Sequence, residues 1–482
     1  MTQRSSLILL FAIVNALHIT HTHPTEMSNH TKYTLQTDKI ENAHNKNNNL
    51  ANQIYDIPAG IFTTTYTHLP ADFKDDVSDA DDYVPYASDV YDRFSWALMK
   101  QILMSIPIPT THRHNNLKSD AVDSFFGADR ENVIFSPFSV KLVLALLTEA
   151  TGNGTCAQSQ LLNTLGDIKS IENLRGFYRK TLTSLKQVHS HYTLRLESRL
   201  YTDTTVKPLS TYSALLQSVY ETPIEQLNFA NSVDAATEIN SWITRATEGR
   251  LQQLVTDEGL AHSVMLLVNA IYFNGSWRRQ FRETYPGIFF RTSRIQLSAS
   301  YMELTDTFYY YQCNDLRARI IRLPYRGQKF SMFVVLPNEG QSVDALMRRM
   351  QNEQLKHMQF MMERTKLRVA LPKFKFDHKT DLKAALCRLG VVDIFTEKAE
   401  LTVMVENRDS RLMVTNILQK SGIDVNEHGT EAYAATEVEI VNRFGGSEYI
   451  EEFIVNRPFL FFIEEERAGN ILFAGKVKNP TL

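Results

Sequence analysis

The sequence predicts an α+β fold built on β-sheets, because helical and strand patterns are interspersed without the regular alternation of a doubly wound fold. Apolar residues recur with helical spacing in residues 140–147, 174–188 and 235–246. Apolar runs of strand length occupy residues 265–273, 331–336, 367–376, 458–463 and 471–477. We expect Asp234 to cap the third of these helices.

The composition is that of a globular protein, with 43% hydrophobic and 22% charged residues among 482. A formal net charge of −3 gives no reason to expect a general nucleic-acid-binding protein. No stretch reaches the roughly 18 consecutive apolar residues that a membrane span requires. We therefore expect partners other than nucleic acid or membrane.

The N-terminus is typical of an export signal. Arg4 supplies a positive charge, residues 7–14 form a short apolar core, and small residues favour cleavage after Ala16. We expect residues 1–16 to be a signal peptide and the mature protein to be secreted. A buried N-terminal helix is the alternative, but the residues that follow are too polar to pack against it.

Residues 17–87 form a polar and acidic stretch that we call the N-terminal extension. We expect it to be disordered, because its Asn-, Thr- and His-rich first part shows no apolar period. Its second part is acidic and carries tyrosines, and serves either as a solubilising tail, which we favour, or as a segment that docks on a basic surface. The folded domain is expected at 88–482, with Ser88 as cap of a first helix whose apolar face holds Val90, Phe94, Ala97, Leu98 and Ile102.

The three cysteines, Cys156, Cys313 and Cys387, are too few and too scattered for a disulfide scaffold, and at most one bridge can form. No spacing suits a metal site, and the sequence motifs of hydrolases, nucleotide-binding proteins and zinc proteases are missing. Ser136 and Ser139 lack a neighbouring base, so we do not expect them to be nucleophiles. The sequence predicts no enzyme, no metal and no cofactor.

A series of short motifs resembles the serpin superfamily. They include V-I-F-S-P-F-S at 133–139, I-N-S-W and T-E-G-R at 239–250, and V-N-A-I-Y-F-N-G-S-W at 268–277. M-F-V-V-L-P at 332–337, L-P-K-F at 371–374, D-I-F at 393–395, N-R-P-F at 456–459 and F-A-G-K-V at 473–477 follow in the family's order. The resemblance covers residues 88–482.

The resemblance implies the serpin fold, with three β-sheets, eight to nine helices and an exposed reactive-centre loop at about residues 427–453. It implies a monomeric protease inhibitor rather than an enzyme. A protease cleaves the loop and forms a covalent complex, and the freed loop then inserts as a new strand in the central sheet. A non-inhibitory serpin that acts as a carrier, chaperone or storage protein is the alternative.

The loop sequence suits such an insertion. In residues 429–441, one face of an extended strand is small or apolar and uncharged, namely Thr430, Ala432, Ala434, Thr436, Val438 and Ile440. The opposite face carries Glu431, Tyr433, Ala435, Glu437, Glu439 and Val441, and Gly429 supplies a flexible pivot. By resemblance, the hinge comprises Glu427, Gly429, Thr430, Ala432, Ala434, Ala435 and Thr436. An ordinary half-buried edge strand is the alternative interpretation.

Arg443 is the expected bait residue, and Arg443–Phe444 the expected reactive bond. In inhibitory relatives the scissile residue lies fourteen positions after the hinge glycine, which is Arg443 here. A trypsin-like protease would bind the guanidinium with a pocket carboxylate. The string N-R-F-G at 442–445 resembles the activation site of arthropod prophenoloxidases, which clip-domain proteases cut. This suggests a negative regulator of melanisation in innate immunity.

Four residues match or replace the family's shutter, which controls opening of the central sheet. Ser136, Ser139 and Asn269 match, whereas Gln419 stands where many serpins have a histidine; Gln419 can bridge by hydrogen bonds but cannot titrate. Trp277 matches a structural residue of the adjoining breach region.

Three sequons, at Asn29, Asn153 and Asn274, predict a glycoprotein. Arg175, Arg179, Lys180 and Lys186 suggest either a polysaccharide site or, as we favour, a solvated helix face.

Overall fold

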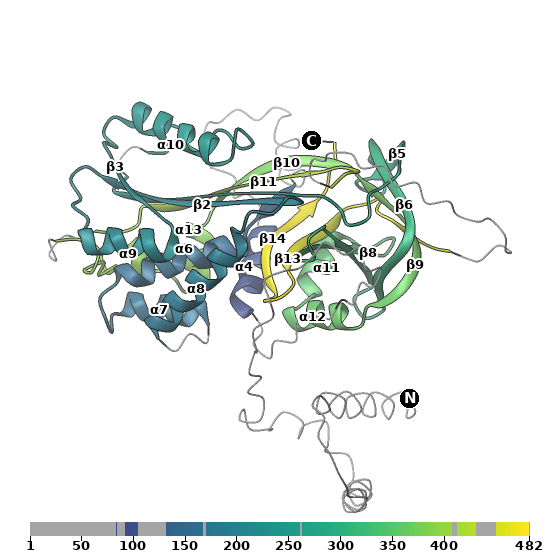
Figure 1. Ribbon diagram of the computed structural model, residues 1–482, viewed down its shortest axis with the longest axis horizontal. Helices are drawn as coiled ribbons and strands as arrows, with labels where there is room; N and C mark the ends of the chain where they lie inside the picture. Colours follow the sequence, from purple (N-terminus) through teal and green to yellow (C-terminus); the bar gives the residue numbers. More distant parts are fainter. Residues whose placement is uncertain are drawn as a thin grey trace, which may run out of the picture. The chain divides into compact units, whose positions relative to one another are not determined.

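Figure 1 shows the computed structural model, which describes residue 83 and residues 92–104, 132–166, 170–260, 263–406, 412–429 and 450–481. These described residues contain nine α-helices and fourteen strands, and they belong to one unit, Val77–Leu482. The predicted α+β class is confirmed. The expected signal peptide and most of the N-terminal extension lie outside the described residues.

A five-stranded sheet has the strand order β10-β11-β4-β2-β3. Its strands are β2 (Tyr192–Asp203), β3 (Ile224–Leu227), β4 (Met265–Gly275), β10 (Phe374–Asp381) and β11 (Asn416–Val425). Ten of the eleven residues of β4 are buried, as expected for a strand that is covered on both faces. β4 runs antiparallel to β2 but parallel to β11.

A nine-stranded sheet follows the order β1-β14-β13-β8-β7-β6-β9-β12, with β5 also paired to β6. Its strands are β1 (Val133–Phe135), β5 (Glu283–Phe290), β6 (Gln296–Cys313), β7 (Ala318–Pro324), β8 (Phe330–Pro337), β9 (Glu363–Pro372), β12 (Glu451–Ile454), β13 (Phe459–Glu465) and β14 (Asn470–Val477). The beginning of β6 pairs with β5, and its end pairs with β7. The three predicted sheets are therefore the five-stranded sheet and the two parts of the nine-stranded sheet that β6 joins.

Helices cover both faces of the five-stranded sheet (Figure 1). On one face lie α6 (Pro137–Ala150), α8 (Ile171–Leu185) and α9 (Ser210–Tyr220). Thirteen of the fourteen residues of α6 are buried, because this helix is apolar on all sides. The opposite face carries α10 (Ser232–Ala246), whose Ile239, Trp242 and Ile243 join a core cluster with Leu266 and Leu418 of the sheet.

The remaining helices border the sheets. They are α4 (Arg93–Leu103), α7 (Cys156–Leu165), α11 (Val343–Arg349), α12 (Asn352–Phe360), α13 (Lys383–Arg388) and a short 3-10 helix at Asp393–Phe395. Lys476 and Lys478, at the end of β14, form ion pairs of 2.8 and 2.7 Å with Asp344 of α11. Burial would raise the pKa of Asp344, but these two lysines hold it below its ordinary value. The C-terminal strand is thereby tied to α11.

Three local predictions were wrong: the start of the first helix, the single strand at 367–376 and the cap of α10. The first helix begins at Arg93 rather than near Ser88, and Asp92 caps it by accepting the Ser95 N–H at 3.0 Å. The predicted strand at 367–376 is two strands, because Lys373 separates β9 from β10.

The cap of α10 was also misassigned. Asn231 is its cap residue, and Asp234 lies in the first turn, where a negative charge also favours the helix. The other predicted helices and strands are confirmed, with ends that shift by a few residues.

Cys156, Cys313 and Cys387 are all unpaired thiols in the structure. In the described part of the chain, no three His, Cys, Asp or Glu side chains gather as a metal site would require. The helices of that part are also too short or too polar to cross a membrane.

We predict that His378, on β10, makes stability depend on pH. Burial, and secondly Lys420, lower the pKa of His378 to about 4, whereas the ordinary value is about 6.5. Below pH 6.5 the unfolded chain therefore binds a proton at His378 that the folded chain does not bind. The free energy of unfolding falls by up to about 1.4 kcal/mol per pH unit as a result. His378→Gln should flatten this fall between pH 6.5 and pH 4. Denaturant midpoints of both proteins, measured from pH 4.5 to 8, check this, and parallel profiles would contradict it.

Candidate functional site

The parallel pair of β4 and β11, which we call the seam, lies at the centre of the five-stranded sheet. Its register runs from Asn416 opposite Leu266 to Gly422 opposite Tyr272. The chain that leaves β11 leads into the expected reactive loop. If that chain turned back, it would run antiparallel to β11 and hence to β4, so it could form antiparallel ladders with both strands. The seam is therefore a geometrically suitable place for an added strand.

Gly429 forms a turn just after β11, at the C-terminal end of the seam. Its N–H donates to the carbonyl of Asn426 at 3.1 Å, and its own carbonyl accepts the Asn426 N–H at 2.9 Å. Its φ is +118°, and a Cβ atom there would lie 2.2 Å from the Gly275 carbonyl oxygen and 2.6 Å from Ser276 Cα. Only glycine fits this conformation against the end of β4. The pivot predicted from the sequence thus also has a steric requirement for glycine.

Glu427 joins the seam to a neighbouring strand end. Its carboxylate forms a 2.7 Å ion pair with Nζ of Lys373, the residue between β9 and β10. Partial burial would raise the pKa of Glu427, but the hydrogen bond and the charge of Lys373 bring it below its ordinary value. The backbone carbonyl of Glu427 also accepts the N–H of Phe281 at 3.1 Å. This hinge residue is therefore fixed by both its side chain and its backbone.

Trp277, two residues after β4, lies at the C-terminal end of the seam. Its indole N–H donates to the carbonyl of Asn426 at 2.9 Å, and its ring stacks on Tyr325 with centroids 4.4 Å apart. Its backbone N–H donates to the carbonyl of His428 at 3.1 Å. The side chain is only 1% exposed. Trp277 therefore links the end of β4 to the residues that follow β11.

The shutter residues meet halfway along the seam. Gln419 of β11 lies directly opposite Asn269 of β4, and its amide nitrogen donates to the Asn269 Oδ1 at 3.1 Å. The Gln419 Oε1 accepts the Ser136 N–H at 2.7 Å, and its amide nitrogen also donates to the Ser136 carbonyl at 3.2 Å. The Ser136 Oγ in turn accepts the Ser139 N–H at 3.1 Å, which caps α6. One neutral side chain thus links both strands of the seam to the start of α6.

Two partners of this network were not predicted from the sequence. Asn269 Nδ2 donates to the hydroxyl of Ser198 on β2 at 3.0 Å, and Ser421 Oγ donates to Gln419 Oε1 at 3.2 Å. Ser198 could have been predicted as a partner from its position opposite Asn269. That position depends on the register between β2 and β4, which the sequence does not show. The same holds for Lys373, whose partner Glu427 lies 54 residues away in the sequence.

β12, which follows the expected loop, is held to the nine-stranded sheet by polar contacts. Arg368 of β9 donates to Glu303 at 2.7 Å and to Glu452 at 2.7 Å. The hydrogen bonds from Arg368 lower the pKa of Glu303. Tyr310 donates its hydroxyl to Glu451 at 2.6 Å. The two ends of the loop are therefore anchored in different sheets.

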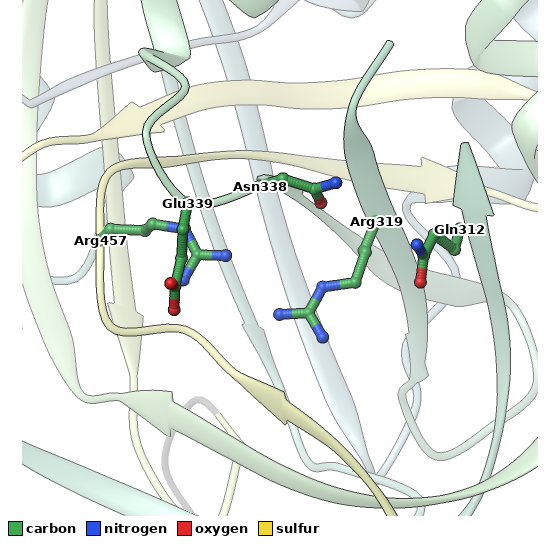
Figure 2. Close-up of a pocket in the computed structure, with 5 residues that line it drawn as sticks. All are labelled: Gln312, Arg319, Asn338, Glu339 and Arg457. Atoms are coloured by element: carbon green, nitrogen blue, oxygen red, sulfur yellow. The ribbon is translucent and has the colours of Figure 1, made fainter. Parts of the chain in front are cut away.

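A shallow pocket of about 250 Å³ is lined by Gln312, Arg319, Asn338, Glu339 and Arg457. Figure 2 shows these five side chains. Arg319 donates to the carbonyl of Glu452 at 2.8 Å, and Arg457 donates to the carbonyl of Pro337 at 2.8 Å. Burial, together with the charge of Arg319, lowers the pKa of Arg457. Arg319 therefore contacts the backbone of β12, whereas Arg457 binds the end of β8.

The other predicted site residues divide into two groups. Those of the loop, Thr430, Ala432, Ala434, Ala435, Thr436, Arg443 and Phe444, lie outside the described residues, as does the sequon Asn29. Asn153 is exposed in the turn before α7, and Asn274 is partly exposed near the end of β4. On α8, Arg175 forms a two-point ion pair with the buried Glu149, and just beyond its end Lys186 pairs with Glu197 and Glu221. These pairs support a structural role for the two cations.

We predict that Gln419→Leu weakens the fold, because it leaves buried polar groups of Ser136 and Asn269 without their partner. Such losses cost about 1–3 kcal/mol for each buried group. Gln419→His is the control, since a neutral imidazole can keep part of the network. Its stability should match wild type more closely at pH 8 and fall as pH drops below about 6.5, because a buried imidazolium is unfavourable. Thermal midpoints at both pH values test this, and an unchanged midpoint for Gln419→Leu would refute it.

Residues 116–480 match the family Serpin (serine protease inhibitor). The chain is 37% identical to serine protease inhibitor 2 of Anopheles gambiae over 376 residues, 76% of this chain and 92% of that protein. Among solved structures, Serpin48 of the insect Tenebrio molitor has a TM-score of 0.67 and 27% identity, with 81% of this chain and 98% of that chain covered. Human thyroxine-binding globulin is similar in fold, with a TM-score of 0.70 at 23% identity, over 81% of this chain and 99% of that chain. The chain therefore belongs to the serpin family.

Proposed function

We propose that this serpin is a secreted inhibitor that traps trypsin-like serine proteases as covalent complexes, with Arg443 as bait. The observation that carries the proposal is the parallel seam followed at once by the Gly429 turn. The segment after this turn has one small, uncharged face that suits burial in a sheet. The name of the mosquito relative, serine protease inhibitor 2, supports the same function. Secretion rests on the signal-like residues 1–16.

The proposed chemistry begins as ordinary proteolysis. The serine hydroxyl of the protease attacks the carbonyl carbon of Arg443, and its proton passes to the amine of Phe444 as the peptide bond breaks. Arg443 is then held to the protease as an ester. The freed segment that follows Gly429 enters the seam as a strand antiparallel to both β4 and β11. The protease moves with it, and distortion of its active site stops hydrolysis of the ester.

Insertion exchanges one ladder of hydrogen bonds for two. The bonds between β4 and β11 are lost, and the new strand gains a partner on each side. Because a backbone hydrogen bond contributes on the order of 1 kcal/mol net, a ladder of this length provides a substantial driving force. The Gln419–Asn269 hydrogen bond spans the seam and must break during the step. Its strength therefore influences how readily the sheet opens.

The loop sequence further suggests a target. The resemblance of N-R-F-G at 442–445 to prophenoloxidase activation sites supports a clip-domain protease of the melanisation cascade. A bait that copies the cut site of a substrate would compete for the same protease. The protein would then limit melanisation as a negative regulator in innate immunity.

We predict that Ala434→Glu converts the inhibitor into a substrate. The carboxylate would have to enter the buried face of the seam, which costs several kcal/mol and slows insertion. Hydrolysis of the ester would then outpace trapping. Ala435→Glu is the matched control, because the opposite face already carries Glu431, Glu437 and Glu439. Denaturing gels after incubation with trypsin measure the covalent complex, and undiminished complex for Ala434→Glu would mean that Ala434 does not face inward.

We predict that Arg443→Ala slows inhibition of trypsin and of a prophenoloxidase-activating protease. Loss of a buried charge pair costs about 2–5 kcal/mol, or roughly 30- to 5000-fold in rate. Arg443→Lys is the control and should keep much of the activity. Second-order inhibition rates test both variants. An unchanged rate for Arg443→Ala would place the reactive bond elsewhere, whereas inhibition of trypsin alone by wild type would exclude the melanisation target. Cleavage without any stable complex would favour a non-inhibitory serpin.

A further inference from the structure

Tyr83 of the N-terminal extension packs against three side chains of the nine-stranded sheet. Tyr309 of β6 lies opposite Arg322 of β7, and Arg322 lies opposite Phe333 of β8. Directly opposed residues project from the same face of a sheet, so these three form a continuous line across three strands. We call the three residues the Arg322 row. Tyr83 is more than two hundred positions from them in the sequence.

The ring of Tyr83 lies over this row. The Arg322 guanidinium carbon is 4.4 Å from the centroid of the Tyr83 ring and 5.7 Å from that of Tyr309. The Tyr83 ring meets Tyr309 edge-on, with centroids 5.4 Å apart, and its centroid is 6.0 Å from that of Phe333. These separations are those of cation–π and aromatic pairs in proteins. The Tyr83 ring therefore makes one cation–π contact, with Arg322, and two aromatic contacts, with Tyr309 and Phe333.

The row is fixed by the sheet itself. Arg322 is 3% exposed and donates to both oxygens of Glu466, at 2.6 and 3.1 Å. This ion pair engages the edge of the guanidinium and leaves its flat face for a ring. Phe333 is fully buried. The hydroxyl of Tyr83 stays protonated, because burial, and then Glu464 and Glu466, raise the pKa of Tyr83.

We propose that the Arg322 row is an intrachain docking site that takes the ring of Tyr83 and ties the N-terminal extension to the folded domain. The segment matched to the serpin family begins only at residue 116, so Tyr83 lies outside it.

The test uses the full-length chain with Tyr83→Ala and Tyr83→Phe. An endoproteinase that cuts before aspartate would cleave at Asp81, Asp82 and Asp89, sites that neither substitution alters. Tyr83→Ala should raise the cleavage rate about ten-fold, which corresponds to a loss of about 1.4 kcal/mol of docking. Tyr83→Phe keeps the ring and should stay within about two-fold of wild type. Hydrogen exchange along β7 should rise only in the alanine variant.

Equal cleavage of wild type and Tyr83→Ala, with equal exchange along β7, would overturn the proposal. So would a Tyr83→Phe variant that is cleaved as fast as Tyr83→Ala, because the ring would then not be the docking group. Protection that disappears on dilution, with a dimer seen by sedimentation, would assign the contact to a second copy instead. None of these measurements depends on protease inhibition, so their outcome is separate from that of the proposed function.

Discussion

The hydrogen bond between Gln419 and Asn269 crosses the seam between two parallel strands, and it joins the centre of the five-stranded sheet through Gln419 to helix α6. β4 and β11 are neighbours in space but distant in sequence, and they pair directly in a parallel ladder. Gln419 also binds both backbone groups of Ser136, at the N-terminus of the most deeply buried helix. Opening the seam therefore disturbs the start of α6 as well as the sheet.

At the C-terminal end of the seam, backbone hydrogen bonds, an ion pair and a glycine turn replace the side-chain network of Gln419. Backbone hydrogen bonds from Trp277 and Phe281 hold His428 and Glu427, and the Lys373–Glu427 ion pair adds a charged contact. Gly429 occupies a space that no side chain can share. A polar network halfway along the seam and a glycine turn at its end therefore hold β4 and β11 together in the described structure.

The chain that enters the loop belongs to the five-stranded sheet, whereas the chain that leaves it belongs to the nine-stranded sheet. β12 is fixed at that second sheet by Arg368 and Tyr310. The proposed loop insertion requires such an arrangement, because a cut between the two anchors leaves each end attached to its own sheet. Tyr83 adds a third attachment, of the N-terminal extension, on the β6, β7 and β8 strands.

The sequence alone predicted the α+β class and most of the elements, because periodicity depends on residues close together in the chain. The resemblance to serpins, rather than periodicity, pointed to Ser136, Ser139, Asn269 and Gln419, and the structure joins these residues by hydrogen bonds. The prediction that Gln419 can bridge by hydrogen bonds is confirmed, whereas the pivot role of Gly429 stays a prediction. Tertiary structure decided the rest. Asp92 rather than Ser88 caps α4, because Asp92 both accepts the Ser95 N–H and pairs with Lys141 of α6. The division of residues 367–376 at Lys373, the role of Ser198 and the docking of Tyr83 depend on strand register between distant segments, which no local pattern encodes.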